Sequence, residues 1–110
     1  MKKVYISGKI SGLPRKKAEK NFKRAEDYLR KLGFITYSPL CLPEGFEWED
    51  YMFIDLTVLS RCDHIYMLKG WEESKGARIE RRYAIEHGKH IIYECENVSK
   101  RLSEQIRNDL

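Results

Sequence analysis

The chain has 110 residues and a formal net charge of +4, with 35% charged and 42% hydrophobic residues. This balance excludes an intrinsically disordered chain, and no apolar run approaches the roughly 20 residues that a membrane helix needs. The length suits one core, so we expect residues 1–110 to form a single domain. Because the basic start Met1-Lys2-Lys3 leads directly into a strand-like run, we expect no signal peptide.

Neither the cysteines nor the histidines form a metal-binding motif. Cys41, Cys62 and Cys95 lie far apart and include no C-x-x-C pair, so they indicate neither a zinc ribbon nor a redox dithiol. Reduced thiols of this kind are typical of the cytoplasm, where we expect the protein to act. His87 and His90 flank the end of a predicted helix and match no zinc motif. We therefore expect no metal site.

The first predicted unit is a strand, a glycine-bracketed loop and a helix. Residues 4–7 form a short apolar run that ends at Gly8, and Pro14 suits the first turn of a helix. Gly33 ends this helix, because glycine favours the turn that follows a helix. The predicted core-facing positions of the helix recur at spacings of four and three, and they are Ala18, Phe22, Ala25, Leu29 and Leu32.

The middle of the chain predicts a second strand and a second helix. Residues 34–38 carry β-branched and aromatic side chains, and Pro39 ends the strand. After a loop over residues 39–47, the pattern becomes helical from Trp48 to about Arg61. The apolar side of this helix comprises Tyr51, Met52, Leu56 and Leu59.

The last part of the chain predicts two more strands and two more helices. Residues 64–68 and 90–93 are short apolar runs typical of buried strands. Between them, a loop over residues 69–73 leads into a helix that ends before Gly88. An amphipathic final helix is predicted from apolar residues at a spacing of four, which are Val98, Leu102 and Ile106.

This alternation of strands and helices indicates an α/β fold. Strands separated by helices pair in parallel through right-handed crossovers, so that helices cover both faces of the sheet. We expect a flavodoxin- or Rossmann-like three-layer α/β/α domain, with a parallel sheet of four to five strands in the order 2-1-3-4. Ligands of such sheets bind beyond the carboxyl ends of the strands, where the strand order switches. The loops over residues 8–12 and 69–74 should therefore lie side by side.

The segment from Gly70 to Glu80 has the form of an anion site. A strand, a turn and a helix with Ser74 and Gly76 at its start provide backbone N–H groups for an anion. Ser74 also suits a plain N-cap, and a cap does not exclude a ligand on the next N–H groups. The loop over residues 8–12 matches neither a Walker loop nor a G-x-G-x-x-G pattern, so it is a weak signal by itself.

Two carboxylates occupy positions where apolar residues are expected. Glu80 has small and aromatic neighbours on its helix face, and Asp55 lies in an almost wholly apolar helical stretch. A carboxylate on a core-facing side needs a partner or a function. For Glu80, a buried ion pair with a nearby arginine remains the alternative. Two carboxylates in one pocket are typical of glycosidic bond cleavage.

The positive net charge leaves nucleic acids and small anionic substrates open as partners. The main basic cluster is Arg15-Lys16-Lys17, which we interpret as a solvated helix face, with attraction of a phosphate as the alternative. The chain has no evident recognition helix and no strand surface that combines aromatic and basic residues. We therefore do not expect nucleic-acid binding.

Three motifs resemble the nucleoside 2-deoxyribosyltransferase superfamily. The opening Tyr5-Ile6-Ser7-Gly8-Lys9-Ile10-Ser11-Gly12 resembles its Tyr-x-x-Gly-x-Ile-x-Gly motif. Asp55-Leu56-Thr57 resembles its Asp-Leu segment, and Ser74-x-Gly76-x-x-x-Glu80 resembles the motif that ends in the nucleophile. The likeness spans residues 4–93 and points to a small bacterial and phage branch related to the 2′-deoxynucleoside 5′-monophosphate N-glycosidases.

The resemblance implies a role for each motif residue. Glu80 would attack the anomeric carbon, Asp55 would serve the departing base, and Tyr5 would orient Glu80. Ser74 would bind the 5′ end of the nucleotide, and because an acid there would repel a phosphate, serine favours a 5′-monophosphate. The substrate-binding residues implied are Gly8, Lys9, Ile10, Ser11, Gly12, Trp71, Ser74 and Gly76. Trp71 either stacks on a base or covers the sheet.

One position departs from the glycosidases, which carry arginine where this chain has Ser11. We expect Lys9 to compensate for this missing positive charge.

The resemblance also implies a homodimer or higher homo-oligomer with a shared site. We therefore expect cleavage of the N-glycosidic bond of a (deoxy)nucleoside 5′-monophosphate, by water or by base exchange, without metal or organic cofactor. A non-catalytic nucleotide-binding module of the same fold is the alternative.

Overall fold

Strands and helices alternate along residues 1–95, the part of the chain that the computed structural model describes. Their order and bounds are β1 (Lys3–Ser7), α1 (Arg15–Lys31), β2 (Ile35–Tyr37), α2 (Trp48–Ser60), β3 (His64–Met67), α3 (Lys75–Glu86) and β4 (His90–Tyr93). Two short 3₁₀ turns, η1 (Pro39–Cys41) and η2 (Trp71–Glu73), precede α2 and α3. The predicted final helix, over Val98 to Leu110, lies outside the described residues.

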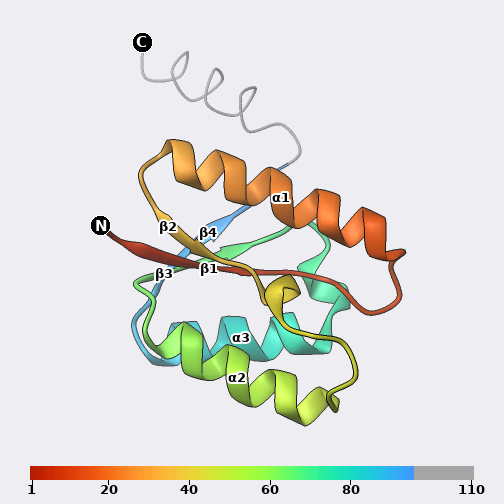
Figure 1. Cartoon of the computed structure of the whole chain (residues 1–110). Coiled ribbons are helices and arrows are strands. Elements are labelled where there is room, and N and C mark those ends of the chain that lie inside the picture. The colour runs from red at the N-terminus through yellow and green to blue at the C-terminus, as the bar shows by residue number, and fades with distance from the viewer. Residues whose placement is uncertain (96–110) are drawn as a thin grey trace.

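The four strands form one parallel sheet in the order β2-β1-β3-β4, which confirms the predicted fold and strand order. In the pairs that β1 forms with its two neighbours, Tyr5 of β1 stands opposite Tyr37 of β2 and Ile65 of β3. Helix α1 covers one face of the sheet, while α2 and α3 cover the other (Figure 1). None of the helices within residues 1–95 has the length and hydrophobicity to cross a membrane.

Alternation along β1 divides the core into two halves. Successive side chains of a strand point to opposite faces. Val4 and Ile6 therefore pack against Phe22 and its neighbours on α1. Tyr5 packs on the other face with residues of α2, β3 and α3, and Ser7, which is fully buried, follows it at a spacing of two. This alternation gives the α3 side of the sheet two hydroxyl groups.

The predicted core positions of α1 are confirmed except at its end. Four are buried, which are Ala18, Phe22, Ala25 and Leu29. The prediction for Leu32 was wrong, because its side chain is 59% exposed. The helix ends at Lys31, and Gly33 then adopts a φ of 94°, which turns the chain. Phe34 packs against the core instead, and its backbone N–H donates to the carbonyl of Leu29.

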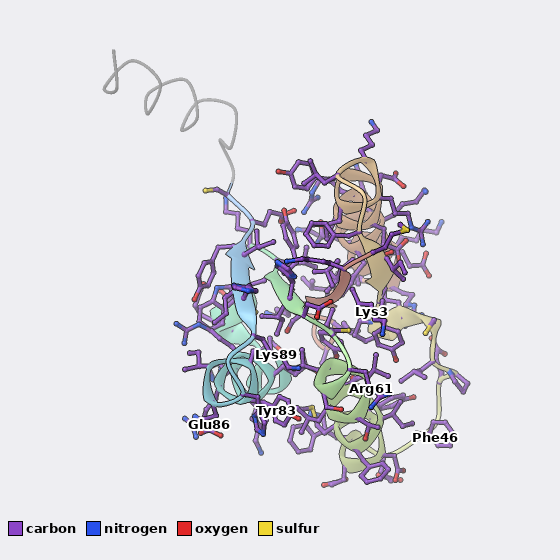
Figure 2. The ribbon with its side chains drawn as sticks, turned by 90° about the vertical axis from the view of Figure 1, so that its left-hand side faces the viewer. Lys3, Phe46, Arg61, Tyr83, Glu86 and Lys89 are labelled. Carbon is purple, nitrogen blue, oxygen red and sulfur yellow. The ribbon has the colours of Figure 1, made fainter. Side chains whose placement is uncertain are left out.

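Several basic side chains lie at the edge of the sheet where the strands begin. Figure 2 labels three of them, Lys3 at the start of β1, Arg61 after α2 and Lys89 before β4. The ammonium of Lys89 donates to the carbonyl of Ser60 over 3.0 Å, so it closes the end of α2. Because these cations lie at the opposite edge from the carboxyl ends of the strands, they belong to a different surface from any ligand site there.

We expect Gly8→Ala to lower the free energy of unfolding by about 1–3 kcal/mol, because it overpacks the end of β1. A Cβ at Gly8 would lie 2.7 Å from Cδ1 and 2.8 Å from Cβ of Leu68. Urea unfolding followed by circular dichroism measures the change. Lys16→Ala, at an exposed position of α1, is the control and should leave the midpoint unchanged. Equal stability of G8A and the wild type would contradict this packing.

Candidate functional site

A cavity of about 210 Å³ opens at the edge where the strands end. Its walls come from the loop after β1, the segment from Pro39 to Glu44, and the first halves of α2 and α3. Helices α1, α2 and α3 all begin at this edge, because each follows the carboxyl end of a strand in a parallel sheet (Figure 1). The predicted convergence of the loops after β1 and β3 is confirmed, since Gly8 and Ser74 both line the cavity and the ammonium of Lys9 lies 3.1 Å from the carboxylate of Glu73.

Glu80 is buried in the cavity wall, with only 5% of the residue exposed. The Tyr5 hydroxyl donates to its Oε2 over 2.6 Å, and the Ser7 hydroxyl donates to its Oε1 over 2.7 Å. Both donors come from β1, where alternation places them on the α3 side. Each carboxylate oxygen therefore accepts one short hydrogen bond, an arrangement that suits the ionised form.

Two arginines of α3 bond to groups other than Glu80. Arg78 donates to the backbone carbonyl of Glu72, and Arg81 donates to the hydroxyl of Tyr93. Within residues 1–95, no ion pair involves Glu80. The alternative of a buried ion pair at this position is therefore wrong for the described chain, and the carboxylate is held by neutral hydroxyl groups instead.

The pKa of Glu80 is raised from 4.5 to about 7. Burial is the main cause, because water no longer solvates the charged form. The hydrogen bonds from Tyr5 and Ser7 oppose this rise, and the nearby charge of Asp55 adds to it. Glu80 therefore titrates near neutral pH.

Asp55 of α2 is the second buried carboxylate of the cavity, with 6% of the residue exposed. Burial raises its pKa from 3.8 to about 6, and hydrogen bonding to Tyr5 and Tyr37 opposes the rise. The Tyr37 hydroxyl lies 3.5 Å from Asp55 Oδ1. The rings of Tyr5 and Tyr37 stack with centroids 5.5 Å apart. A pair of stacked tyrosines thus contacts both carboxylates.

Ser74 caps α3 at the rim of the cavity. Its hydroxyl oxygen accepts a hydrogen bond from the backbone N–H of Ala77 over 3.2 Å. Gly76 lines the cavity beside it, and a Cβ there would lie 3.3 Å from the sulfur of Met52. The capping role of Ser74 is therefore present, and its hydroxyl proton and the first N–H groups of α3 still provide donors toward the cavity.

Most of the predicted site residues gather around this cavity. It is lined by Gly8, Ile10, Ser11, Asp55, Ser74, Gly76 and Glu80, and Tyr5 reaches it through its bond to Glu80. Three predicted residues lie outside its lining, namely Lys9, Gly12 and Trp71. Gly12 turns the chain before α1 with a φ of 84°. Trp71 packs against the sheet core and under the guanidinium of Arg81, so it covers the sheet.

Two of the hydroxyl groups around the carboxylates were not predicted as site residues. The signal for Ser7 was present in the sequence, because it follows Tyr5 at the spacing that shares one face of a strand. The signal for Tyr37 is its register opposite Tyr5 in the parallel pair. The lining residues that were not predicted are Arg15, Pro39, Leu40, Leu42, Glu44, Trp48, Tyr51, Met52 and Ala77. The segment before α2 supplies four of them, Pro39, Leu40, Leu42 and Glu44, through long-range contacts that periodicity does not predict.

The described residues offer no evident metal centre. Within residues 1–95, no group of three or more His, Cys, Asp and Glu side chains is placed to hold a metal ion. The two buried carboxylates face hydroxyl groups rather than further ligands.

We expect Glu80→Gln to flatten the pH dependence of stability. Folding raises the pKa of Glu80 from 4.5 to about 7, so the folded state binds more protons than the unfolded state in this interval. The free energy of unfolding therefore falls as pH rises from about 4.5 to 7, by at most about 3 kcal/mol from this residue. Thermal melts of both proteins between pH 4.5 and 8 measure the difference.

Glu86→Gln is the matched control for these melts, because Glu86 lies exposed on the same helix. It should keep the pH dependence of the wild type. An equally steep fall of melting temperature with pH in E80Q and in the wild type would show that Glu80 does not titrate in this range.

Comparison with known proteins places the chain in a family. A family model described as a domain of unknown function, DUF4406, matches residues 2–93. The match covers all four strands, the three helices between them and both buried carboxylates. No curated protein gave a significant match. The chain therefore belongs to the DUF4406 family.

Proposed function

We propose that this protein cleaves the N-glycosidic bond of a (deoxy)nucleoside 5′-monophosphate, with Glu80 as the nucleophile. The observation that carries the proposal is the buried Glu80 carboxylate, held by Tyr5 and Ser7 at the wall of a cavity that also contains Asp55. The likeness of its motifs to the nucleoside 2-deoxyribosyltransferase superfamily supports it. So does the DUF4406 match, which spans those motifs.

The first step forms a glycosyl ester on Glu80. One Glu80 oxygen attacks C1′ of the sugar, and the bond from C1′ to the base nitrogen breaks with its electron pair going to the base. The protonated carboxyl of Asp55 gives its proton to the departing base. Tyr5 and Ser7 hold the attacking carboxylate in place, because each donates to one of its oxygens.

The second step releases the sugar. Water, or the nitrogen of a second base, attacks C1′ and the bond to Glu80 breaks with its electrons returning to the carboxylate. Asp55, now ionised, takes the proton from the attacking group. Hydrolysis and base exchange therefore share the same intermediate and differ only in the acceptor.

The first step needs a proton on Asp55 and an ionised carboxylate on Glu80. In the free protein the pKa values are about 6 for Asp55 and about 7 for Glu80, so the one proton that the pair holds between about pH 6 and pH 7 lies mainly on Glu80. The proposed reaction therefore requires that substrate binding shifts this proton from Glu80 to Asp55. The hydrogen bonds from Tyr5 and Ser7 to both oxygens of Glu80 favour its ionised form and so help this shift.

The 5′-phosphate is proposed from the start of α3. Ser74 is neutral where an acid would repel a phosphate, and the N–H groups of the first turn add a partial positive charge. We also propose a cytoplasmic location, and a homodimer or higher homo-oligomer.

We expect the wild type to release free base from at least one deoxynucleoside 5′-monophosphate, as measured by chromatography over a panel of the four. Glu80→Gln should abolish release because the nucleophile is lost. Asp55→Asn should reduce kcat by about 100-fold or more, because the proton donor is lost. Glu86→Gln is the control and should match the wild type.

Neither base release nor base exchange from any member of the panel, with folded protein, would contradict the proposed reaction. In that case calorimetry with the same nucleotides separates the alternatives. Binding of unaltered nucleotide would support a non-catalytic nucleotide-binding module, in which Glu80 accepts a hydrogen bond from a sugar hydroxyl.

Tyr37→Phe tests the coupling of the tyrosines to Asp55. Loss of the Tyr37 hydroxyl removes a hydrogen bond that lowers the pKa of Asp55, so this pKa should rise above about 6. The profile of kcat/KM against pH should shift its alkaline limb toward higher pH, because Asp55 must be protonated in the first step, while the stacking on Tyr5 keeps the ring in place. An unchanged profile would show that Tyr37 does not act on Asp55.

A further inference from the structure

The charges around the cavity are mostly negative. Among the described residues that line it, Arg15 is the single basic one, and the acidic ones are Glu44, Asp55 and Glu80. A phosphate dianion that enters such a cavity meets repulsion from each ionised carboxylate. A substrate with a phosphate therefore needs the cation of Arg15 more than it would in a neutral pocket.

Lys9 does not supply this cation. Its ammonium pairs with Glu73 at 3.1 Å, and it lines a separate hollow on the α1 side of the sheet together with Lys17 and Arg24. The expectation that Lys9 compensates for the missing arginine at Ser11 has no support from this placement. Ser11 itself lines the cavity, as does Arg15 at the start of α1.

The guanidinium of Arg15 has donors to spare. Its Nε donates to Glu19 over 3.2 Å, and its Nη2 donates to the carbonyl of Leu40 over 3.3 Å. Since a guanidinium carries five N–H bonds, three remain for another acceptor. The planar guanidinium matches the spacing of two phosphate oxygens, and it can bind them through two parallel N–H···O hydrogen bonds.

Glu44 is a weak partner for the remaining donors. Its carboxylate lies 3.9 Å from Nη1 of Arg15, and its side chain is 82% exposed. An exposed pair at this distance contributes little to stability. A phosphate dianion brings more charge and better geometry to the same guanidinium, so it can replace Glu44 there.

We propose that Arg15 is the residue that selects a phosphorylated substrate, and that Glu44 occupies its guanidinium until the phosphate displaces it. This inference rests on the proposed function, because it adds Arg15 to the start of α3 as a partner of the 5′-phosphate of that substrate. Removal of Arg15 weakens recognition of the phosphate, and removal of the charge of Glu44 strengthens it. If Arg15 only fastened α1 to the carbonyl of Leu40, its removal would not change the preference for a phosphorylated substrate. Removal of the Glu44 charge would then not strengthen recognition of the phosphate either.

The test compares a deoxynucleoside 5′-monophosphate with the same deoxynucleoside lacking the phosphate. We expect Arg15→Gln to lower kcat/KM for the monophosphate by about 10- to 100-fold and to leave that for the nucleoside within about twofold. Glu44→Gln should lower KM for the monophosphate a few-fold. Lys16→Gln, at an exposed neighbouring position on α1, is the control and should match the wild type. Thermal melts check that each variant is folded.

The outcomes separate this inference from the proposed function. An equal loss of kcat/KM on both substrates in R15Q would overturn the role of Arg15, and so would an unchanged preference for the monophosphate. Neither result would contradict base release by the wild type. An unchanged or higher KM in E44Q would overturn the role of Glu44. If the wild type releases no base at all, calorimetry with the monophosphate and the nucleoside decides. Weaker binding of the monophosphate alone in R15Q would then support the inference, and equal affinities in R15Q and the wild type would overturn it.

Discussion

The site depends on the hydrogen bond from the Tyr5 hydroxyl to Glu80, at 2.6 Å. An ionised carboxylate inside a core is costly unless donors replace the water that it loses. β1 supplies two such donors, Tyr5 and Ser7, on the same face of one strand. Tyr5 is itself fully buried and stacks on Tyr37 of the neighbouring strand. The carboxylate is therefore held by the middle of the sheet rather than by a loop, which gives a nucleophile a rigid support.

The parallel topology arranges charge around that carboxylate. All the strands end at one edge, so the starts of α1, α2 and α3 meet there and their first turns face the same cavity (Figure 1). Basic residues such as Lys3, Arg61 and Lys89 lie at the opposite edge (Figure 2). The net charge of +4 therefore says little about the cavity, whose charged lining residues within the described chain are acidic apart from Arg15. The phosphate recognition that we propose for this cavity therefore depends on helix N-termini and one guanidinium.

Periodicity predicted the fold because each element buries one face, and the strand order follows from the crossovers that helices impose. It also identified Glu80 and Asp55, since a carboxylate on an apolar helix face stands out against its neighbours. The partners of these carboxylates were harder to find. Ser7 meets Glu80 across 73 positions of the chain, and that pairing depends on tertiary packing. Leu32 was misplaced because a glycine turn, rather than the helical spacing, decides the end of α1.

The central claim is that Glu80 forms a covalent bond to the sugar during turnover, and the stereochemistry of the product tests it most directly. Methanol offered as the acceptor with a deoxynucleoside 5′-monophosphate gives a methyl glycoside whose anomeric configuration is stable and readable by NMR. Two displacements at C1′, the first by Glu80 and the second by methanol, predict that the β configuration of the substrate is retained. A product of inverted, α configuration would contradict the account, because it would mean that the acceptor displaces the base in a single step without a glycosyl–Glu80 intermediate.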